Sequence, residues 1–389
     1  MTGAGHKGRA HARPARARKA RGPFARGFRQ RNPLVLVAAA VLGGLFLLLV
    51  QSAALHGDFT VVPEANYIRI ANDDFVHVSY TLAQLRRNPP KGPVVYIFGG
   101  SGAIEMFVSE RALAAAIAAA GGGQVQVISL AAHQQTLAQT LAIIDYMPPG
   151  KGVLLVGLAP NRFTSSPAQD VGLLSARQIL LRSPVLEKLA PKVFDQGQPF
   201  GGVIPGIFDY LGSYMRQRAA TGPFWGVGVP YAHHYYPPGK KGATDAAKLR
   251  TIQQVLAADK LRYAARADYN FAMLERIVKL GQERGYKVVF YDEPLDTAIG
   301  GSTWSGVLPA YQARAQALAD RYGVPYLHPQ AASGATNADF ADLYHLLQSG
   351  RFKWQVELAR LLAPITREVT APAGVPPASP VAAPSPAAS

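Results

Sequence analysis

A serine follows an apolar segment at residues 94–98, within a turn that is rich in glycine. The segment reads Val-Val-Tyr-Ile-Phe and Gly-Gly-Ser-Gly comes directly after it, so Ser101 stands between an expected strand and an expected helix. A buried parallel strand that ends at glycines puts such a turn at the carboxyl edge of the sheet, where open α/β folds bind ligands. Backbone N–H groups and the positive end of the helix dipole can stabilise an oxyanion there. Ser101 is therefore a candidate nucleophile, and the alternative is an ordinary helix N-cap.

A carboxylate and an imidazole are spaced three residues apart further along the chain. Asp342 precedes His345 in the sequence Phe-Ala-Asp-Leu-Tyr-His-Leu, in the loop expected after the fifth strand. At this spacing the carboxylate can orient the imidazole, while the other ring nitrogen reaches a serine hydroxyl. The carboxyl ends of parallel strands share one edge of a sheet, so we expect this loop to meet the turn that carries Ser101. The three residues together predict a nucleophile, a general base and the group that orients the base.

Strands that alternate with helices are expected to position these residues, in a domain that covers residues 93–368. Apolar runs predict strands at 94–98, 124–130, 153–159, 287–292 and 324–328. Periodic segments between them predict helices at about 103–120, 134–146, 245–283, 306–322 and 346–363. This alternation is typical of a parallel sheet with helices on both faces. The predicted fold class is therefore α/β, a three-layer α/β/α sandwich with a five-stranded parallel sheet.

Two regions interrupt the alternation. Residues 52–92 form a lead-in whose alternating apolar patches predict short edge strands or extended chain. Residues 160–243 form a long irregular insertion rich in Pro, Gly and aromatic residues, and such insertions often act as lids or substrate platforms. The aromatic side chains either stack on sugar rings or pack within the protein, and the candidates for substrate binding are Trp225, Tyr231, Tyr235 and Tyr236. His233 and His234 are adjacent and have no nearby carboxylate, so no metal site is predicted.

The positive charge of the chain is concentrated at its N-terminus. The chain has 389 residues with 40 Lys or Arg and 24 Asp or Glu. Residues 1–32 hold ten of the basic residues and no acidic one, so the rest carries 30 against 24, a net charge of +6. This mild charge argues against nucleic acid as a partner. The chain has no cysteine, which excludes disulfides, thiolate metal sites and thiol catalysis.

An uncharged apolar segment of seventeen residues, Leu34 to Val50, follows the basic tail. Its length falls within the range of membrane-spanning helices. Because the positive charges precede it, we expect a cytoplasmic tail at 1–33, a transmembrane signal-anchor at 34–51 and an exported body. The alternative is a secretory signal that is cleaved near Ser52-Ala53-Ala54. The expected location is the inner (cell) membrane, single-pass, with the C-terminal domain in the periplasm or outside the cell; residues 369–389 predict a disordered Pro/Ala tail.

With these motifs the chain resembles the SGNH (GDSL-like) hydrolase superfamily. Within it, the chain is similar to the membrane-anchored branch that includes the teichoic acid D-alanyl-transfer protein and the alginate O-acetylation proteins. The similar residues are Phe98-Gly-Gly-Ser101 and Phe340-Ala-Asp342-Leu-Tyr-His345-Leu, with Gly350 after the histidine, and the resemblance covers roughly residues 94–160 and 285–365. It implies an SGNH/flavodoxin-like fold in which Ser101 is the nucleophile, His345 the general base and then acid, and Asp342 the group that orients His345.

The resemblance also implies an oxyanion hole made by the Ser101 amide, a backbone amide after the second strand and an Asn side chain after the third. Gln134 stands where the family usually has glycine, and Asn161 is the candidate side chain, two residues later than usual. Asn161 is otherwise a plain turn residue. Asp292 and Glu293 reach the same edge of the sheet, and we interpret them as loop residues or substrate contacts.

These observations predict a membrane-anchored, exported serine acyl-ester hydrolase or O-acyltransferase, with acetyl as the expected group and an envelope or exported polysaccharide as substrate. No metal, nucleotide or other cofactor is expected. The expected partners are the polysaccharide or another ester-bearing envelope substrate, and a membrane-bound O-acyltransferase. Two alternatives stay open: a catalytically silent envelope scaffold or glycan-binding module with the same fold, and an esterase or lipase of small or lipid esters.

Overall fold

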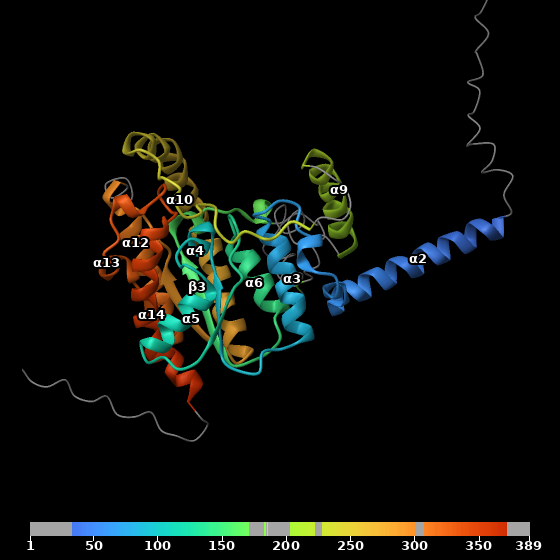
Figure 1. Ribbon diagram of the computed structural model, residues 1–389, viewed down its shortest axis with the longest axis horizontal. Coiled ribbons are helices and arrows are strands. Elements are labelled where there is room, and N and C mark those ends of the chain that lie inside the picture. Colours follow the sequence, from blue (N-terminus) through green and yellow to red (C-terminus); the bar gives the residue numbers. More distant parts are fainter. Residues whose placement is uncertain are drawn as a thin grey trace, which may run out of the picture. The chain divides into compact units, whose positions relative to one another are not determined.

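The computed structural model describes residues 33–170, 183, 185, 203–221, 228–299 and 307–371 (Figure 1). The chain divides into two compact units, Met1–Val50 and Gln51–Ser389. Helix α2 (Pro33–His56) supplies the described part of the first unit, and all five strands belong to the second. The residues expected to do chemistry lie in the second unit.

Five parallel strands form the centre of this unit. They are β1 (Val94–Phe98), β2 (Gln126–Ser129), β3 (Gly152–Leu158), β4 (Lys287–Asp292) and β5 (Tyr326–Leu327). Their order across the sheet is β2-β1-β3-β4-β5, and every neighbouring pair is parallel. The direction of the strand order reverses beside β1, which is the position where open α/β sheets bind ligands. The α/β fold class and the five-stranded parallel sheet predicted from the sequence are confirmed.

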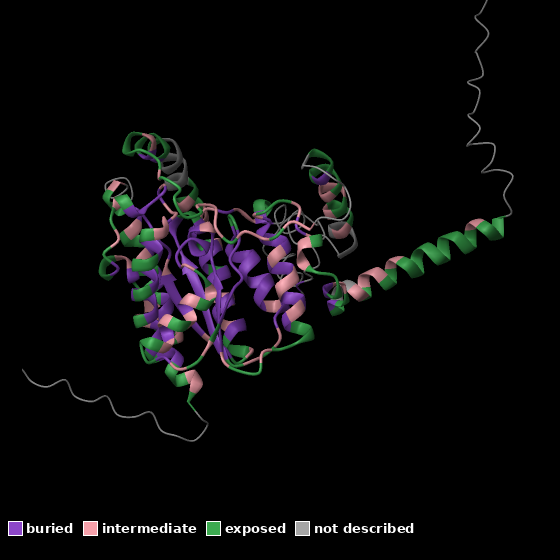
Figure 2. Cartoon of the chain, in the orientation of Figure 1, coloured by how far each residue is buried: buried purple, intermediate pink, exposed green. Residues whose placement is uncertain are grey.

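Helices cover both faces of the sheet (Figure 1). One face packs against α5 (Glu110–Ala119) and α14 (Gln348–Thr370), and the other against α3 (Asp74–Arg87), α6 (Leu137–Tyr146), α10 (Asp245–Glu283) and α12 (Leu308–Tyr322). Strand β1 shows why two cores form: Tyr96 and Phe98 point into one and Val95 and Ile97 into the other, because successive side chains alternate across a strand. Figure 2 shows the buried residues running through the sheet and along the inner sides of the helices.

The lead-in is helical, and the prediction of edge strands there is wrong. It contains two 3-10 helices, η1 (Asp58–Val61) and η2 (Glu64–Asn66), followed by α3. Phe75, Val78, Leu82 and Leu85 all belong to one core cluster. They recur every three or four residues, which is the period of a helix face. The apolar alternation at residues 75–80 is therefore incidental, and α3 is part of the packed body.

The remaining predicted elements are present, with some changes of bounds. Helix α10 and strand β4 have the predicted bounds, and α14 continues to Thr370 instead of ending near 363. The helix predicted at 103–120 is two helices, α4 (Ser101–Ile104) and α5. The insertion is not wholly irregular, because it contains η3 (Pro160–Phe163) and α9 (Val203–Thr221). After β5 come α13 (Pro329–Ala332) and η4 (Asn337–Asp339). Residues 372–389 of the predicted tail lie outside the described residues.

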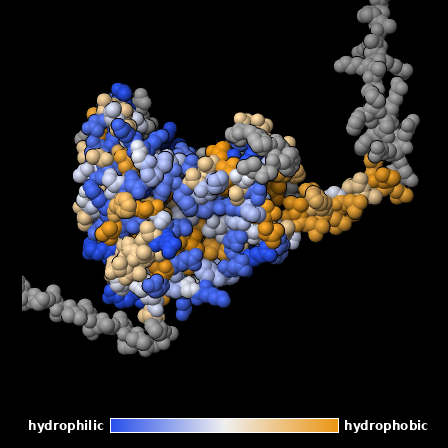
Figure 3. All heavy atoms as spheres, in the orientation of Figure 1, coloured by the Kyte–Doolittle hydropathy of each residue, from blue (hydrophilic) through white to orange (hydrophobic). Residues whose placement is uncertain are grey.

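Helix α2 contains the uncharged segment. Its apolar part, Pro33–Ala53, has 21 residues and a mean hydropathy of 2.7, which is long and apolar enough to cross a membrane. Its spheres are orange along the helix in Figure 3, and its most apolar stretch has no residue buried inside the protein. One such helix near the N-terminus is typical of a membrane anchor and also of a signal sequence.

Candidate active site

Ser101, His345 and Asp342 form a continuous chain of hydrogen bonds. Ser101 Oγ lies 2.7 Å from His345 Nε2. His345 Nδ1 lies 2.7 Å from Oδ2 and 2.8 Å from Oδ1 of Asp342. In this arrangement an imidazole can accept the serine proton while the carboxylate fixes the ring. The fold thus brings together the three residues singled out in the sequence, although 244 positions separate Ser101 from His345.

Ser101 is positioned by the end of a fully buried strand. Every residue of β1 is buried, and the chain leaves the strand through Gly99 and Gly100 to begin α4 at Ser101. Among the described residues the backbone N–H of Ser101 has no hydrogen-bond partner. It is a first-turn helix amide, and such amides are favourable sites for negative charge. The hydroxyl and a free amide are therefore available at the same residue.

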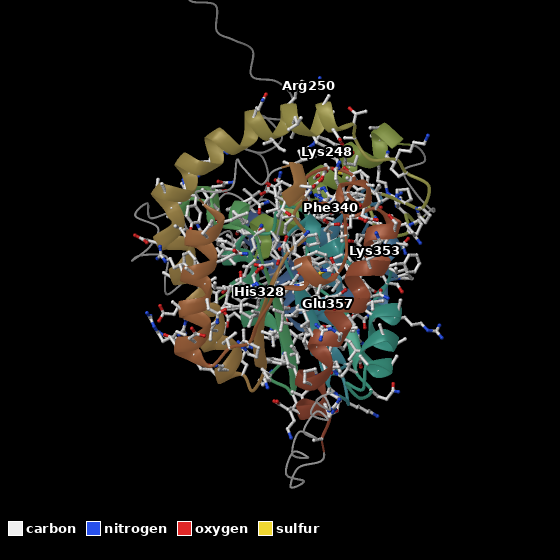
Figure 4. The ribbon with its side chains drawn as sticks, turned by 90° about the vertical axis from the view of Figure 1, so that its left-hand side faces the viewer. Lys248, Arg250, His328, Phe340, Lys353 and Glu357 are labelled. Atoms are coloured by element: carbon white, nitrogen blue, oxygen red, sulfur yellow. The ribbon has the colours of Figure 1, made fainter. Side chains whose placement is uncertain are left out.

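Two lysines hold the loop that carries Asp342 and His345. Lys248 on α10 donates to the side-chain oxygen of Asn337 at 2.6 Å and to its carbonyl at 3.0 Å. Lys353 on α14 donates to Asp339 at 2.7 Å. Figure 4 labels the two lysines, which lie on different helices, together with Phe340, a buried residue of the loop. The loop that supplies the base is thus bound to α10 and α14 at residues that precede Asp342 and His345.

Asp342 is held as a carboxylate. It accepts hydrogen bonds from the amides of Tyr344 at 2.9 Å and His345 at 3.0 Å, and from the hydroxyl of Tyr236 at 3.0 Å. Burial favours the neutral acid, but the hydrogen bonds and charge of His345 and the two amides outweigh it, so the pKa of Asp342 is lowered. Burial and the negative charge of Asp342 raise the pKa of Tyr236 to about 12, which keeps its hydroxyl a donor.

The insertion forms a wall beside His345. The ring centroids of Tyr236 and Tyr235 lie 5.5 Å and 6.4 Å from that of His345. The backbone of this segment is fixed by a buried ion pair between Glu105 and Arg351. The Tyr235 amide donates to Glu105 at 2.5 Å, and Arg351 donates to the Tyr236 carbonyl at 2.7 Å. Both tyrosines are therefore held from within the core.

Tyr231 and Tyr235 share a buried carboxylate. Both donate their hydroxyls to Asp74 on α3, Tyr231 at 2.9 Å. Burial raises the pKa of Asp74 despite these hydrogen bonds. Tyr231 also stacks on His77, with ring centroids 4.0 Å apart. One face of Tyr231 is thus occupied by protein, and the role of these rings in sugar stacking stays a prediction. Trp225 lies outside the described residues.

Gln134 and Asn161 both line the space beside Ser101. Gln134 has φ of 53°, and no other non-glycine residue in the described part of the chain has a positive φ. This left-handed region favours glycine. The turn therefore has a glycine-like backbone and keeps its side chain. Asn161 lies in η3, where its exposed side chain borders the same space.

A cavity of about 250 Å³ opens beside Ser101. Uncharged hydrogen-bonding side chains from several loops predominate in its lining: Gln134, Gln135, Thr136, Asn161, Thr164, Ser165 and Gln169. Carboxamides and hydroxyls offer both donors and acceptors. The lining suits a small polar group better than a long hydrocarbon chain.

Glu293 and Arg162 also line this cavity, and their side chains are 5% and 3% exposed. From the sequence, Glu293 is interpreted as a loop residue or substrate contact, and Arg162 is not singled out. Glu293 Oε1 accepts the Gly100 amide at 3.0 Å and lies 3.7 Å from Arg162 Nη1. Burial raises the pKa of Glu293 and lowers that of Arg162, and each charge partly offsets this effect on the other. The signal that could have found Glu293 is its position directly after a buried strand.

Asp292 has different partners. Its carboxylate accepts the hydroxyl of Tyr326 and lies 2.7 Å from His328 Nδ1. The hydrogen bond to Asp292 raises the pKa of His328. Asp292 is thus bound to β5 and the residue after it, not to the triad.

No protein-family model matches the chain, and a comparison with curated proteins finds no match. Within the described ranges, no group of three or more His, Cys, Asp or Glu residues could hold a metal ion. The chemistry of the site is therefore inferred from its own geometry.

Proposed function

We propose that this protein is an exported, membrane-anchored serine acyl-ester hydrolase or O-acyltransferase. The observation that carries the proposal is the unbroken chain of hydrogen bonds from Ser101 Oγ through His345 to Asp342. It lies at the carboxyl edge of a parallel sheet and beside a cavity, which is where such folds place reactive groups.

In the first step the Oγ of Ser101 attacks the carbonyl carbon of an ester, and His345 Nε2 takes the hydroxyl proton. The ester C–O bond then breaks, and the leaving oxygen receives that proton from His345. The products are a free alcohol and an acyl group on Ser101. Asp342 orients the imidazole and stabilises its charged form during this transfer.

In the second step an acceptor hydroxyl attacks the acyl carbon, with water giving hydrolysis and a sugar hydroxyl giving acyl transfer. His345 takes the proton of the acceptor and returns it to Ser101. The negative oxygen formed in each step is stabilised by the Ser101 amide, by Gln134 and by Asn161. One such donor is typically worth about 2.7–4 kcal/mol of transition-state stabilisation.

The lining of the cavity supports a hydroxyl-rich acceptor and a short acyl group. Uncharged hydrogen-bonding side chains predominate in the lining of a space of about 250 Å³. The exposed ones, Gln134, Asn161 and Gln169, offer donors and acceptors that suit hydroxyl groups better than a hydrocarbon chain. This feature favours acetyl transfer or removal on an envelope or exported polysaccharide over action on lipid esters. Helix α2 would hold the enzyme at the membrane while the polymer passes.

A serine-reactive fluorophosphonate tests the proposal on the purified full-length protein. We expect the wild type to be labelled at Ser101 and Ser101→Ala not to be labelled, since the chain has no cysteine to react in its place. His345→Ala should react at least 100-fold more slowly, because Ser101 then lacks its general base. Hydrolysis of a chromogenic acetyl ester should fall in parallel.

The control is Ser109→Ala, which removes the N-cap of α5 and should leave the labelling rate unchanged. Labelling that persists in Ser101→Ala would contradict the assignment of the nucleophile. A folded wild type that neither labels nor hydrolyses the ester would favour the silent scaffold.

A further inference from the structure

Glu293 and Arg162 lie beneath the turn that presents Ser101. Glu293 follows β4 and accepts the Gly100 amide, one residue before the nucleophile. Gly99, which precedes Gly100, donates its amide to the side chain of Gln135 at 3.3 Å. The two amides that precede Ser101 are thus bound by buried side chains from two other loops.

The glycines around the nucleophile make room for the carboxylate. A Cβ added at Gly99 or at Gly157 would lie 2.6 Å from Glu293 Oε1, and one at Gly102 would lie 3.2 Å from Oε2. Real Cβ atoms do not approach oxygen as closely as 2.6 Å. The glycines of the Gly-Gly-Ser-Gly sequence therefore leave space for the Glu293 carboxylate, in addition to allowing the turn.

Arg162 connects the other two loops of the site. It donates to the carbonyl of Gly157 at the end of β3 and to the carbonyl of Gln135 after β2, the latter at 3.1 Å. It also donates to Thr140 at 2.7 Å on α6. The ion pair of Arg162 with Glu293 thereby links the chain segments that carry Ser101, Gln134 and Asn161.

We propose that Glu293 is a positioning residue, which with Arg162 fixes the geometry of the three oxyanion donors. The inference rests on the proposed function. A buried ion pair is a poor source of stability, since apolar residues of similar volume often stabilise a fold equally well. The ion pair lies under the turn that presents the nucleophile, where it can hold the oxyanion donors in fixed geometry before charge develops on the substrate.

The test compares Glu293→Gln with Glu293→Ala in the full-length protein, using the chromogenic acetyl ester. Glutamine keeps an acceptor for the Gly100 amide and loses the charge, so we expect kcat to fall about 10-fold. Alanine loses both, and we expect a fall of 100-fold or more, comparable to the loss of one oxyanion donor. KM should stay within about threefold, because Glu293 acts through the turn and not on bound substrate.

Rates are expressed per site titrated with the fluorophosphonate. A purely structural role would lower the number of titratable sites and leave kcat per site unchanged. The matched control is Asp145→Asn, which breaks the ion pair to Arg284 at the other end of α6 and should leave kcat per site within about twofold.

Unchanged kcat per site in both Glu293 variants would overturn the inference, as would an equal loss in Asp145→Asn. If Glu293→Ala does not fold, the comparison of kcat per site between Glu293→Gln and wild type decides alone. Turnover that survives in Ser101→Ala would instead overturn the proposed function, so the two failures are distinguishable.

Discussion

Asp170 is a buried carboxyl group that links protonation to folding. Its side chain accepts the hydroxyls of Tyr269 at 2.7 Å and Ser165 at 3.4 Å. Burial raises its pKa from 3.8 to about 6 despite these hydrogen bonds. The native state therefore binds the proton more tightly than the unfolded chain, so this contribution to stability is fully present below the unfolded pKa and is lost as pH rises through about 6.

The variant Asp170→Asn cannot titrate at this position. We expect its free energy of unfolding, relative to wild type, to increase between pH 4 and pH 8 by up to about 3 kcal/mol, at 1.36 kcal/mol for each unit of pKa shift. Denaturant unfolding at both pH values measures the change. The exposed Asp209→Asn is the control, and a relative stability of Asp170→Asn that does not vary with pH would contradict the expectation.

Individual residues of the site differ in how far the sequence predicts them. Ser101, Asp342 and His345 carry recognisable chemistry, and parallel strands bring their loops to one edge. The position of Glu293 after a buried strand brings it to the same edge, but its role and that of Arg162 depend on packing between loops that are remote in sequence. The sequence predicts Gln134 only by its position after the second strand, and its left-handed backbone is visible only in the structure.

Among the elements, α10 and β4 could be predicted to the residue, because Thr244 caps the helix and the apolar residues of β4 are bounded by Lys287 and Asp292. Helix α3 could not. Its Phe75–Tyr80 segment alternates like a strand, and the decisive apolar residues, Leu82 and Leu85, lie beyond it. Packing against the core therefore decides between strand-like alternation and the helical period, which the segment alone does not distinguish.

The loop of His345 depends on two lysines in different environments. Lys248 is 2% exposed and its ion-pair partner Asp296 is 1% exposed, whereas Lys353 is 43% exposed. Lys248→Met removes the ion-pair partner of the buried Asp296, so we expect a loss of about 3–5 kcal/mol of stability. Lys353→Met should cost about 1 kcal/mol or less, because solvent screens its ion pair with Asp339.

Denaturant unfolding and the labelling rate of Ser101 are measured on both variants. The lysine-to-methionine change is the same in each, so Lys353→Met serves as the control for Lys248→Met. Equal losses of stability would contradict the view that the buried lysine is the principal tie of the loop.

At the scale of the whole molecule, charge and hydropathy divide the chain into three parts. Ten basic residues precede residue 33, an apolar helix of 21 residues follows, and the body has a net charge near neutrality for its size. Positive charge on one flank of a membrane helix keeps that flank in the cytoplasm. This order of segments favours an exported body, which the proposed envelope substrate requires.

The absence of cysteine allows a direct test of orientation, since each introduced thiol is unique. In intact cells with a permeabilised outer layer, a membrane-impermeant maleimide should label Val356→Cys, which replaces a side chain that is 65% exposed on α14. Ala10→Cys in the basic tail should react only after lysis, because the membrane shields it. A mature protein that lacks the Ala10→Cys segment would indicate a cleaved signal instead of an anchor. Labelling of Ala10→Cys alone in intact cells would reverse the topology and remove the basis for an envelope polysaccharide as substrate.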